Sequence, residues 1–138
     1  MKIERNFGEV FPYSLHDARI TKIEHLDNQL ILHMDSLFYY TDNQTEQIHK
    51  ATILFEQVDK EDVEFFVFED TVTGDFSGTC IGLEEYQKKY QDSEFEVIVE
   101  TYNWRRAVFQ GWLWTGATPV TCLMNIFYSG KMLYQISE

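Results

Sequence analysis

The residues of this chain that could hold a metal or activate water are its four histidines and the acids near them. His16 and Asp17 are adjacent, and metal-dependent phosphohydrolases use such a pair together with further histidine and aspartate ligands from other helices. Here the pair precedes a predicted β-hairpin. A turn in which Asp17 caps backbone amides and His16 hydrogen-bonds locally explains the pair as well.

A second set of candidate metal ligands comprises His25, His33 and Asp35. His33 and Asp35 are two residues apart and so share a strand face, and His25 lies on the partner strand of the same predicted hairpin. Two imidazoles and a carboxylate can make a metal site. A two-residue loop would turn His25 away from His33, however, so solvent-facing polar residues explain the pattern, and we predict no metal and no cofactor.

Other catalytic patterns lack their defining residues. The acids are too numerous for one pair to stand out as a glycosidase dyad, and no Gly-x-Ser-x-Gly elbow is present. The segment TGDFSGT is not followed by the Gly-Lys-Ser/Thr of a phosphate-binding loop. Cys80 and Cys122 have no activating motif beside them, and we expect buried free thiols. We therefore predict no catalytic residues.

The strongest binding candidate is the turn Tyr102-Asn103-Trp104-Arg105-Arg106. Tryptophan, tyrosine and arginine are enriched at interface hot spots, and arginine both stacks on indole and binds carboxylates bidentately. The alternative is that Trp104 covers an edge of the core while both arginines form ion pairs with acids on neighbouring strands. The partner-binding candidates of this turn are Tyr102, Trp104, Arg105 and Arg106.

Trp112 and Trp114 share a strand face with Val108 and form an aromatic stripe. Such a stripe belongs more often to the core than to a ligand pocket. If it faced outwards, it would mark an association surface. In the pocket alternative, Phe109, Trp112 and Trp114 line a cavity.

Nearly all of the charge imbalance lies in residues 56–100. The chain has a net charge of −12, and this segment holds 14 of the 23 acids against three lysines, a balance of −11. Opposite potentials steer association and add specificity, so the segment predicts a basic protein partner. The partner-binding candidates within it are Glu61, Asp62, Glu64, Glu69 and Asp70.

Composition excludes several classes of protein. An excess of acids argues against nucleic-acid binding, which depends on Lys and Arg neutralising phosphates, and against an anionic membrane surface. No run approaches the ~20 apolar residues of a membrane span, and the start MKIERNFGEVF has charges where a signal peptide would be apolar. A length of 138 residues suits one domain, residues 1–138. We expect a cytoplasmic protein.

Strands must position these residues, because period-two patterns dominate the chain. Ala18–His25 and Leu30–Asp35 flank the turn pair Asp27-Asn28 and predict a β-hairpin. A bulge is expected where Ile20 and Ile23 break the alternation.

Gln47–Gln57 and Val63–Phe68 flank a polar loop and predict a second hairpin. The second half of Val63–Phe68 is apolar on both faces, and such a strand is usually covered on both sides. We expect a helix, a second sheet or another subunit over its outer face.

After a predicted loop at Thr71–Thr79, one helix is expected at Leu83–Tyr90, where apolar residues recur at helical spacing. The strand that follows should direct Val97 and Val99 inwards and Glu96 and Glu100 towards solvent. Sequential strands usually neighbour one another, so we expect a four-stranded meander from Glu94–Tyr102, Ala107–Trp114, Val120–Tyr128 and Met132–Ile136.

The expected fold is mainly β, of the α+β kind: an antiparallel, twisted sheet of about eight strands, partly rolled into a barrel or folded as a sandwich. The short helix near 83–90 would plug an end or cover one face. A homodimer through the doubly apolar strand or the aromatic C-terminal strands is a further prediction.

The segment YSLHDARITKIEHLDNQLILHMD, residues 13–35, resembles the start of small, uncharacterised bacterial β-rich proteins in which a Leu-His-Asp element leads into a hairpin. Some proteins of that kind are assigned as immunity proteins of bacterial toxin systems. The first functional hypothesis is therefore a non-catalytic acidic domain that docks a basic protein partner, which the resemblance implies would be a toxin. The alternative is a small-ligand-binding or enzymatic β-barrel with an aromatic-lined pocket.

Overall fold

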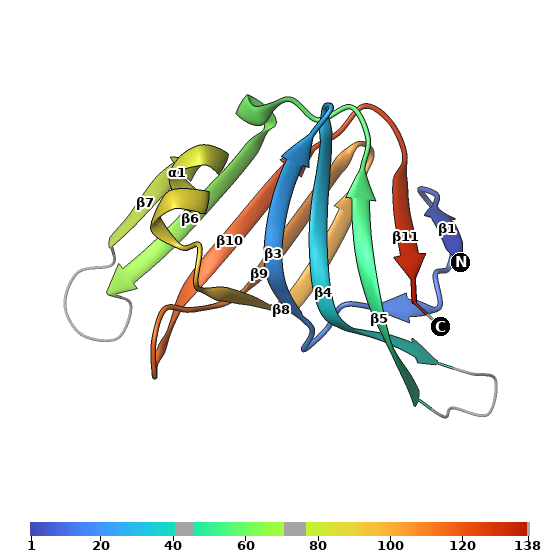
Figure 1. Ribbon diagram of the computed structural model, residues 1–138, viewed down its shortest axis with the longest axis horizontal. Helices are drawn as coiled ribbons and strands as arrows, with labels where there is room; N and C mark the ends of the chain where they lie inside the picture. Colours follow the sequence, from blue (N-terminus) through green and yellow to red (C-terminus); the bar gives the residue numbers. More distant parts are fainter. Residues whose placement is uncertain (41–45, 71–76, 138) are drawn as a thin grey trace.

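The computed structural model describes residues 1–40, 46–70 and 77–137, which form one antiparallel sheet of eleven strands with a short α-helix (Figure 1). The prediction of a mainly β chain is confirmed, with more strands than the eight expected. The elements are β1 (Lys2–Arg5), β2 (Tyr13–Ser14), β3 (Arg19–Leu26), β4 (Gln29–Tyr40), β5 (Glu46–Phe55), the 3-10 turn η1 (Lys60–Asp62), β6 (Val63–Asp70), β7 (Ser77–Gly82), α1 (Leu83–Lys89), β8 (Glu94–Asn103), β9 (Arg106–Trp114), β10 (Pro119–Phe127) and β11 (Met132–Ile136).

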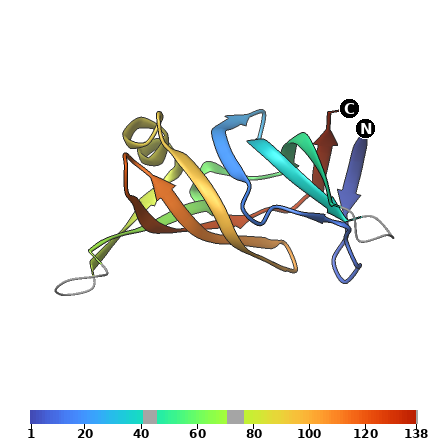
Figure 2. The ribbon, with the colours of Figure 1, turned by 90° about the horizontal axis from the view of Figure 1, so that it is seen from below.

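The strands are paired in the order β1-β11-β5-β4-β3-β8-β9-β10-β6-β7, and β2 pairs with β4 beside this path. The sheet is therefore open, with β1 and β7 as its edges. It bends between β3 and β8, so that its two halves enclose a common core (Figure 2). Phe55 and Tyr134 from one half and Phe95 and Phe109 from the other are fully buried there.

The first predicted hairpin is confirmed. β3 and β4 are joined by Asp27-Asn28, whose φ values of 51° and 61° are both left-handed. Two residues with positive φ form the type I′ turn that matches the twist of paired strands. The register of β3 against β4 shifts between Ile20 and Lys22, which is the predicted bulge.

The second predicted hairpin is wrong. β5 pairs with β4 and β11, whereas β6 pairs with β10 and β7. Beyond β5, Gln57 has a left-handed φ of 56°, and the N–H of the buried Val58 donates to the carbonyl of Asn28 at 2.9 Å. This contact ties the connection to the β3–β4 turn, and η1 then leads the chain to the other half of the sheet.

The predicted meander contains three strands, not four. β8, β9 and β10 are sequential neighbours, but β11 pairs with β5 and β1. Ser129 donates its N–H to Gln57 at 3.1 Å and Gly130 to Glu56 at 3.0 Å, so this turn binds the β5–η1 connection. A Cβ at Gly130 would lie 2.6 Å from the Glu56 side chain, so a residue without a side chain suits this crossing.

The predicted helix is confirmed within one residue, and it lies on the core side of the sheet. Leu83, Tyr86 and Tyr90 are buried, and the Tyr86 ring stacks on Phe65 with ring centroids 3.8 Å apart. Gln87 of α1 donates to the Ile23 carbonyl of β3 at 3.0 Å. The helix thus connects β6 to β3 across the bend of the sheet.

The prediction of a loop at Thr71–Thr79 is wrong for its last three residues. Ser77–Gly82 pair with β6 as the edge strand β7, and Phe68 lies across Gly78, whose Cβ would be 2.7 Å from the ring. The remainder of the predicted loop, residues 71–76, lies outside the described residues. Phe66, on the face of β6 opposite the helix, is half-buried, so α1 does not provide the expected outer cover.

Candidate functional site

A β-bulge in β8 decides which acids face solvent. The register against β9 shifts between Val97 and Val99, which reverses the alternation predicted for the second half of the strand. Val99 is consequently 47% exposed, and Glu100 points to the core side, which corrects the expectation that it faces solvent. Gly111 allows this approach, because a Cβ there would lie 1.8 Å from the Glu96 carbonyl oxygen.

Glu100 binds the N-terminal segment to β8. Its Oε2 accepts the Leu15 N–H at 2.7 Å and the Ser14 hydroxyl at 3.2 Å, and its Oε1 accepts the Tyr102 hydroxyl at 2.8 Å. The Tyr102 hydroxyl lies 3.4 Å from that of Tyr134. Burial raises the pKa of Tyr134 to about 12 and that of Tyr102 well above its ordinary value, so both tyrosines are neutral hydrogen-bonding groups at neutral pH.

His16 and Asp17 form a structural turn against β8. The Asp17 N–H donates to the Val97 carbonyl at 2.7 Å, and Asp17 has a φ of 67°. His16 has the predicted local contacts, because its N–H donates to the Ser14 hydroxyl at 3.1 Å and its Nε2 lies 3.4 Å from Asp17 Oδ2. Its Nδ1 also lies 2.7 Å from the Ile98 carbonyl oxygen of β8, a distant partner that the sequence did not predict.

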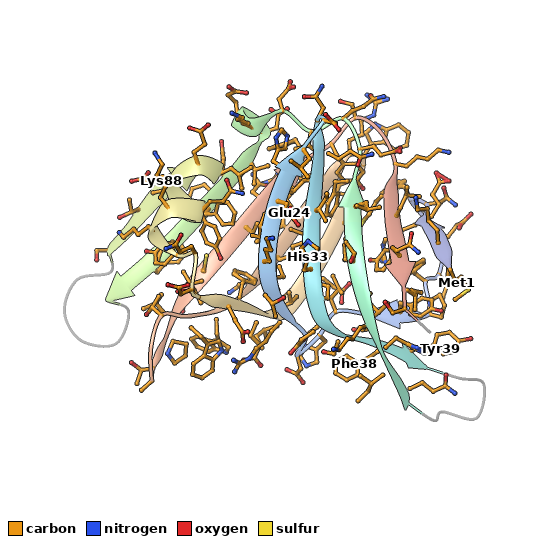
Figure 3. All side chains as sticks on the ribbon, viewed as in Figure 1. Met1, Glu24, His33, Phe38, Tyr39 and Lys88 are labelled. Atoms are coloured by element: carbon orange, nitrogen blue, oxygen red, sulfur yellow. The ribbon has the colours of Figure 1, made fainter. Side chains whose placement is uncertain are left out.

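The three candidate metal ligands His25, His33 and Asp35 have separate partners. His25 Nε2 lies 2.7 Å from the Val58 carbonyl oxygen, and His33 Nε2 lies 2.5 Å from Glu24 Oε1 on the outer face (Figure 3). Asp35 accepts the N–H of Arg19 at 2.8 Å. Within the ranges that the structure describes, no group of three His, Cys, Asp or Glu residues could hold a metal ion.

The pocket predicted from Phe109, Trp112 and Trp114 is not formed by these residues. Phe109 is fully buried, whereas Trp112 is 41% exposed on the opposite face of β9. Trp114 shares that outer face, where its Nε1 donates to Glu96 at 2.9 Å and the guanidinium of Arg19 lies 4.8 Å from its ring centroid. The aromatic stripe is therefore outer surface, and its assignment to the core was wrong.

Of the hot-spot residues predicted in the β8–β9 turn, some are free to contact a partner and one is used inside the protein. Trp104 is 66% exposed and contacts Phe7 edge-to-face, with ring centroids 5.5 Å apart. Arg105, at a φ of 62°, is exposed. Arg106 instead folds back, and its Nε donates to the buried Asn125 Oδ1 at 2.7 Å. Trp104 and Arg105 are thus available to a partner, while Arg106 satisfies a buried amide.

A surface hollow of about 410 Å³ lies between the N-terminal segment and this turn. The guanidinium of Arg5 stacks on the Tyr102 ring at 3.9 Å within it. Sequence reasoning missed Arg5 and Phe7, because nothing in their local pattern shows that they meet a turn about a hundred residues later. The hollow is lined by two arginines, two glutamates and four aromatic residues together with small and neutral polar residues; the charged and aromatic members are Arg5, Arg105, Glu9, Glu100, Phe7, Tyr102, Trp104 and Tyr128.

Most of the acids of residues 56–100 that the structure describes fall into two groups. Those of β8 are engaged: Arg19 Nη1 lies 3.1 Å from Glu94, and Glu96 and Glu100 accept the hydrogen bonds given above. A second group, here named the acidic surface, lies at the end of the sheet where Lys60 of η1 contacts Glu84 of α1, and it includes Glu64 on the outer face of β6 directly after η1. Its members are Asp59, Glu61, Asp62, Glu64, Glu84 and Glu85.

The acidic surface is exposed or half-exposed throughout. Lys60 Nζ lies 2.9 Å from Glu84 Oε1, and this hydrogen bond lowers the pKa of Glu84 and raises that of Lys60. The predicted residues Glu61, Asp62 and Glu64 belong to this surface. The side chains of Glu69 and Asp70 lie outside the described residues.

The acidic surface and the β8–β9 turn occupy the same end of the sheet. In register, Ala107 of β9 pairs with Ile126 of β10, which pairs with Val63 of β6 directly after η1. Only β10 lies between β9, which begins at the turn, and β6, which begins after η1, so one protein partner could contact both surfaces.

Comparison of the chain with models of protein families, with curated proteins and with solved structures finds no match. The resemblance of residues 13–35 to bacterial immunity proteins thus stays a prediction. In the described part of the chain, no helix is long and apolar enough to cross a membrane.

Proposed function

We propose that this protein is a non-catalytic binding domain whose acidic surface docks a basic protein partner. The observation that carries the proposal is that six exposed or half-exposed carboxylates, from η1 and its N-cap, from β6 and from α1, lie at one end of the sheet, where Lys60 pairs with Glu84. Exposed like charges repel one another and lower the stability of the folded chain. A complementary basic partner would relieve that repulsion, and it would associate faster because opposite potentials steer the encounter.

The β8–β9 turn supports the same proposal. Trp104 and Arg105 are of the types found at hot spots, and both are exposed at the end of the sheet that carries the acidic surface. The charges would steer the encounter and the aromatic turn would supply desolvated contact area. A toxin neutralised by this protein would be a partner of that kind, as the resemblance of residues 13–35 implies.

The test uses the whole protein as bait in an extract of its source organism. The variant Glu61→Gln/Glu85→Gln removes two charges from the acidic surface and leaves the Lys60–Glu84 pair intact. The control Asp17→Asn/Asp92→Asn removes the same number of exposed charges. Asp17 precedes β3 and Asp92 precedes β8, at the ends of these strands that lie away from the β8–β9 turn. Asparagine also tolerates the left-handed φ of Asp17.

The wild type and the control should retain one basic protein at low salt, and should release it at about 0.5 M NaCl, where screening shortens the reach of charges to a few ångströms. The acidic-surface variant should retain much less of it. Equal retention by both variants, or retention of an acidic protein only, would contradict the proposal.

A second candidate function, small-ligand binding, rests on the hollow beside Trp104. Its two arginines could bind a carboxylate and its four aromatic rings a flat ring, although Glu9 and Glu100 offset the charge of the arginines. Benzoate should change the fluorescence of the wild type and of the control Trp112→Phe but not that of Trp104→Phe. A response of equal size in all three proteins would dismiss this candidate.

A further inference from the structure

The strand β7 is an open edge of the sheet. It pairs with β6 on one side, and among the described residues no strand pairs with its other side (Figure 1). Every second N–H and C=O of an edge strand points away from the sheet. Such a row of backbone groups is a template for another strand.

The two edges of this sheet differ in their protection. β1 (KIER) carries three charged side chains, which is a common way to prevent unwanted pairing. β7 (SGTCIG) has no charge and no proline. Its first four residues are exposed although they alternate between the two faces, and Ile81 is buried near the start of α1.

The surroundings of β7 indicate which kind of strand would pair with it. Glu64 is the register partner of Gly82 at the end of β7, and Glu84 and Glu85 follow it in α1. A second copy of this chain, with its net charge of −12, would be repelled there. A segment with Lys or Arg side chains would be attracted.

The outer face beside β7 offers contact for the alternate side chains of an added strand. Cys80 pairs with Phe66 of β6, and Phe66 pairs with Leu123 of β10. Phe66 and Leu123 are only half-buried on this face. Backbone pairing with side-chain contacts at every second residue is the usual mode of strand addition.

We infer that the basic partner docks by adding an extended, lysine- or arginine-bearing segment to the free edge of β7. This inference rests on the proposed function and names how that partner is held. The acidic surface attracts the segment, and the backbone groups of Ser77–Cys80 bind it.

The test uses the full chain and a synthetic peptide, acetyl-Lys-Val-Lys-Thr-Lys-Val-Lys-amide, followed by NMR and amide hydrogen exchange at about 50 mM salt, where charges are weakly screened. The control peptide has the same sequence with every backbone nitrogen methylated, so that it keeps its charge but cannot donate a backbone hydrogen bond along either edge. Exchange at the outward amides of Ser77–Cys80 should slow by about tenfold or more with the first peptide only.

Protein variants examine the same edge. Consecutive N–H groups of a strand point to opposite sides, so one of Thr79 and Cys80 directs its N–H towards β6 and the other directs it outwards. Proline at the outward position should leave the pairing with β6 intact and should abolish the exchange protection that the first peptide gives. Cys80→Ala keeps the backbone and serves as the matched control, which should bind as the wild type does.

Three outcomes would overturn the inference. Chemical-shift changes confined to Glu61, Glu84 and Glu85, with unchanged exchange in β7, would leave the proposed function in place and remove strand addition. Equal effects of both peptides, or no effect of either, would also reject pairing at the edge. A doubled mass in sedimentation of the free protein, with β7 amides already protected, would assign the edge to a second copy.

Discussion

At the scale of residues, Glu100 illustrates what a sequence pattern can and cannot predict. The alternation of Glu94–Tyr102 predicts a strand, and the structure contains it. The bulge after Val97 is not visible in that pattern, because the signal lies in Gly111 of the neighbouring strand, where a side chain would meet the Glu96 backbone. From the sequence alone, Glu100 is therefore predicted to be a solvent-facing acid, although in the structure it binds Leu15 and Tyr102.

Replacement of Glu100 should be costly. Glu100→Ala would leave the Leu15 N–H and the Tyr102 hydroxyl without their acceptor, and we expect the free energy of unfolding to fall by about 2–4 kcal/mol. Glu94→Gln, which alters a half-exposed ion pair with Arg19, should cost less than about 1 kcal/mol. Urea unfolding of both variants measures the difference, and equal losses would show that Glu100 is an ordinary surface acid.

The buried tyrosines predict loss of stability in alkali. Burial raises the pKa of Tyr134 to about 12, so the folded state retains a proton that the unfolded state loses near its ordinary pKa of 10.0. The contribution of Tyr134 is fully present below pH 10 and is lost as the pH rises towards 12, at about 1.4 kcal/mol per pH unit. The slope of unfolding free energy against pH in this interval should be shallower for Tyr134→Phe than for the wild type. An unchanged slope would contradict the raised pKa.

At the scale of elements, the sequence predicts strands better than it predicts their partners. The bounds of α1 and of the last four strands agree with the expectations to within one residue. The false second hairpin and the false fourth meander strand share one cause. The connections at Glu56-Gln57 and Ser129-Gly130 hydrogen-bond to each other, and no local pattern of residues 56–62 or 129–130 reveals a contact over that separation.

Gly111 should be the glycine on which the β8–β9 pairing depends most. A Cβ there would overlap the Glu96 carbonyl at 1.8 Å, so Gly111→Ala must displace β8 and should lower the free energy of unfolding by about 3 kcal/mol or more. Gly116→Ala is the matched control, because nothing lies within 4 Å of a Cβ at that position. Thermal unfolding compares them; a Gly111→Ala protein as stable as the control would contradict the close approach of the two strands.

At the scale of the whole molecule, the acidic surface contains fewer acids than the acidic segment of the sequence, residues 56–100. The excess of acids in residues 56–100 predicts a localised negative potential, but the chain uses Glu94, Glu96 and Glu100 in internal contacts. The residues that the sequence could place correctly on the acidic surface were those around η1, since a polar loop of acids is exposed in almost any fold. The aromatic hollow next to Trp104 could not be predicted, because Arg5 and Phe7 reach it only through the pairing of β1 with β11.

The account as a whole depends on steering by the acidic surface. The most direct measurement is the association rate constant of the purified partner with the wild type, Glu61→Gln/Glu85→Gln and Asp17→Asn/Asp92→Asn, recorded by stopped flow between about 0.05 and 0.5 M NaCl. We predict that the wild-type rate falls by about tenfold or more over this range, that the control follows it, and that the acidic-surface variant starts lower with a weaker salt dependence. A rate that is insensitive to salt and equal in all three proteins would contradict the account.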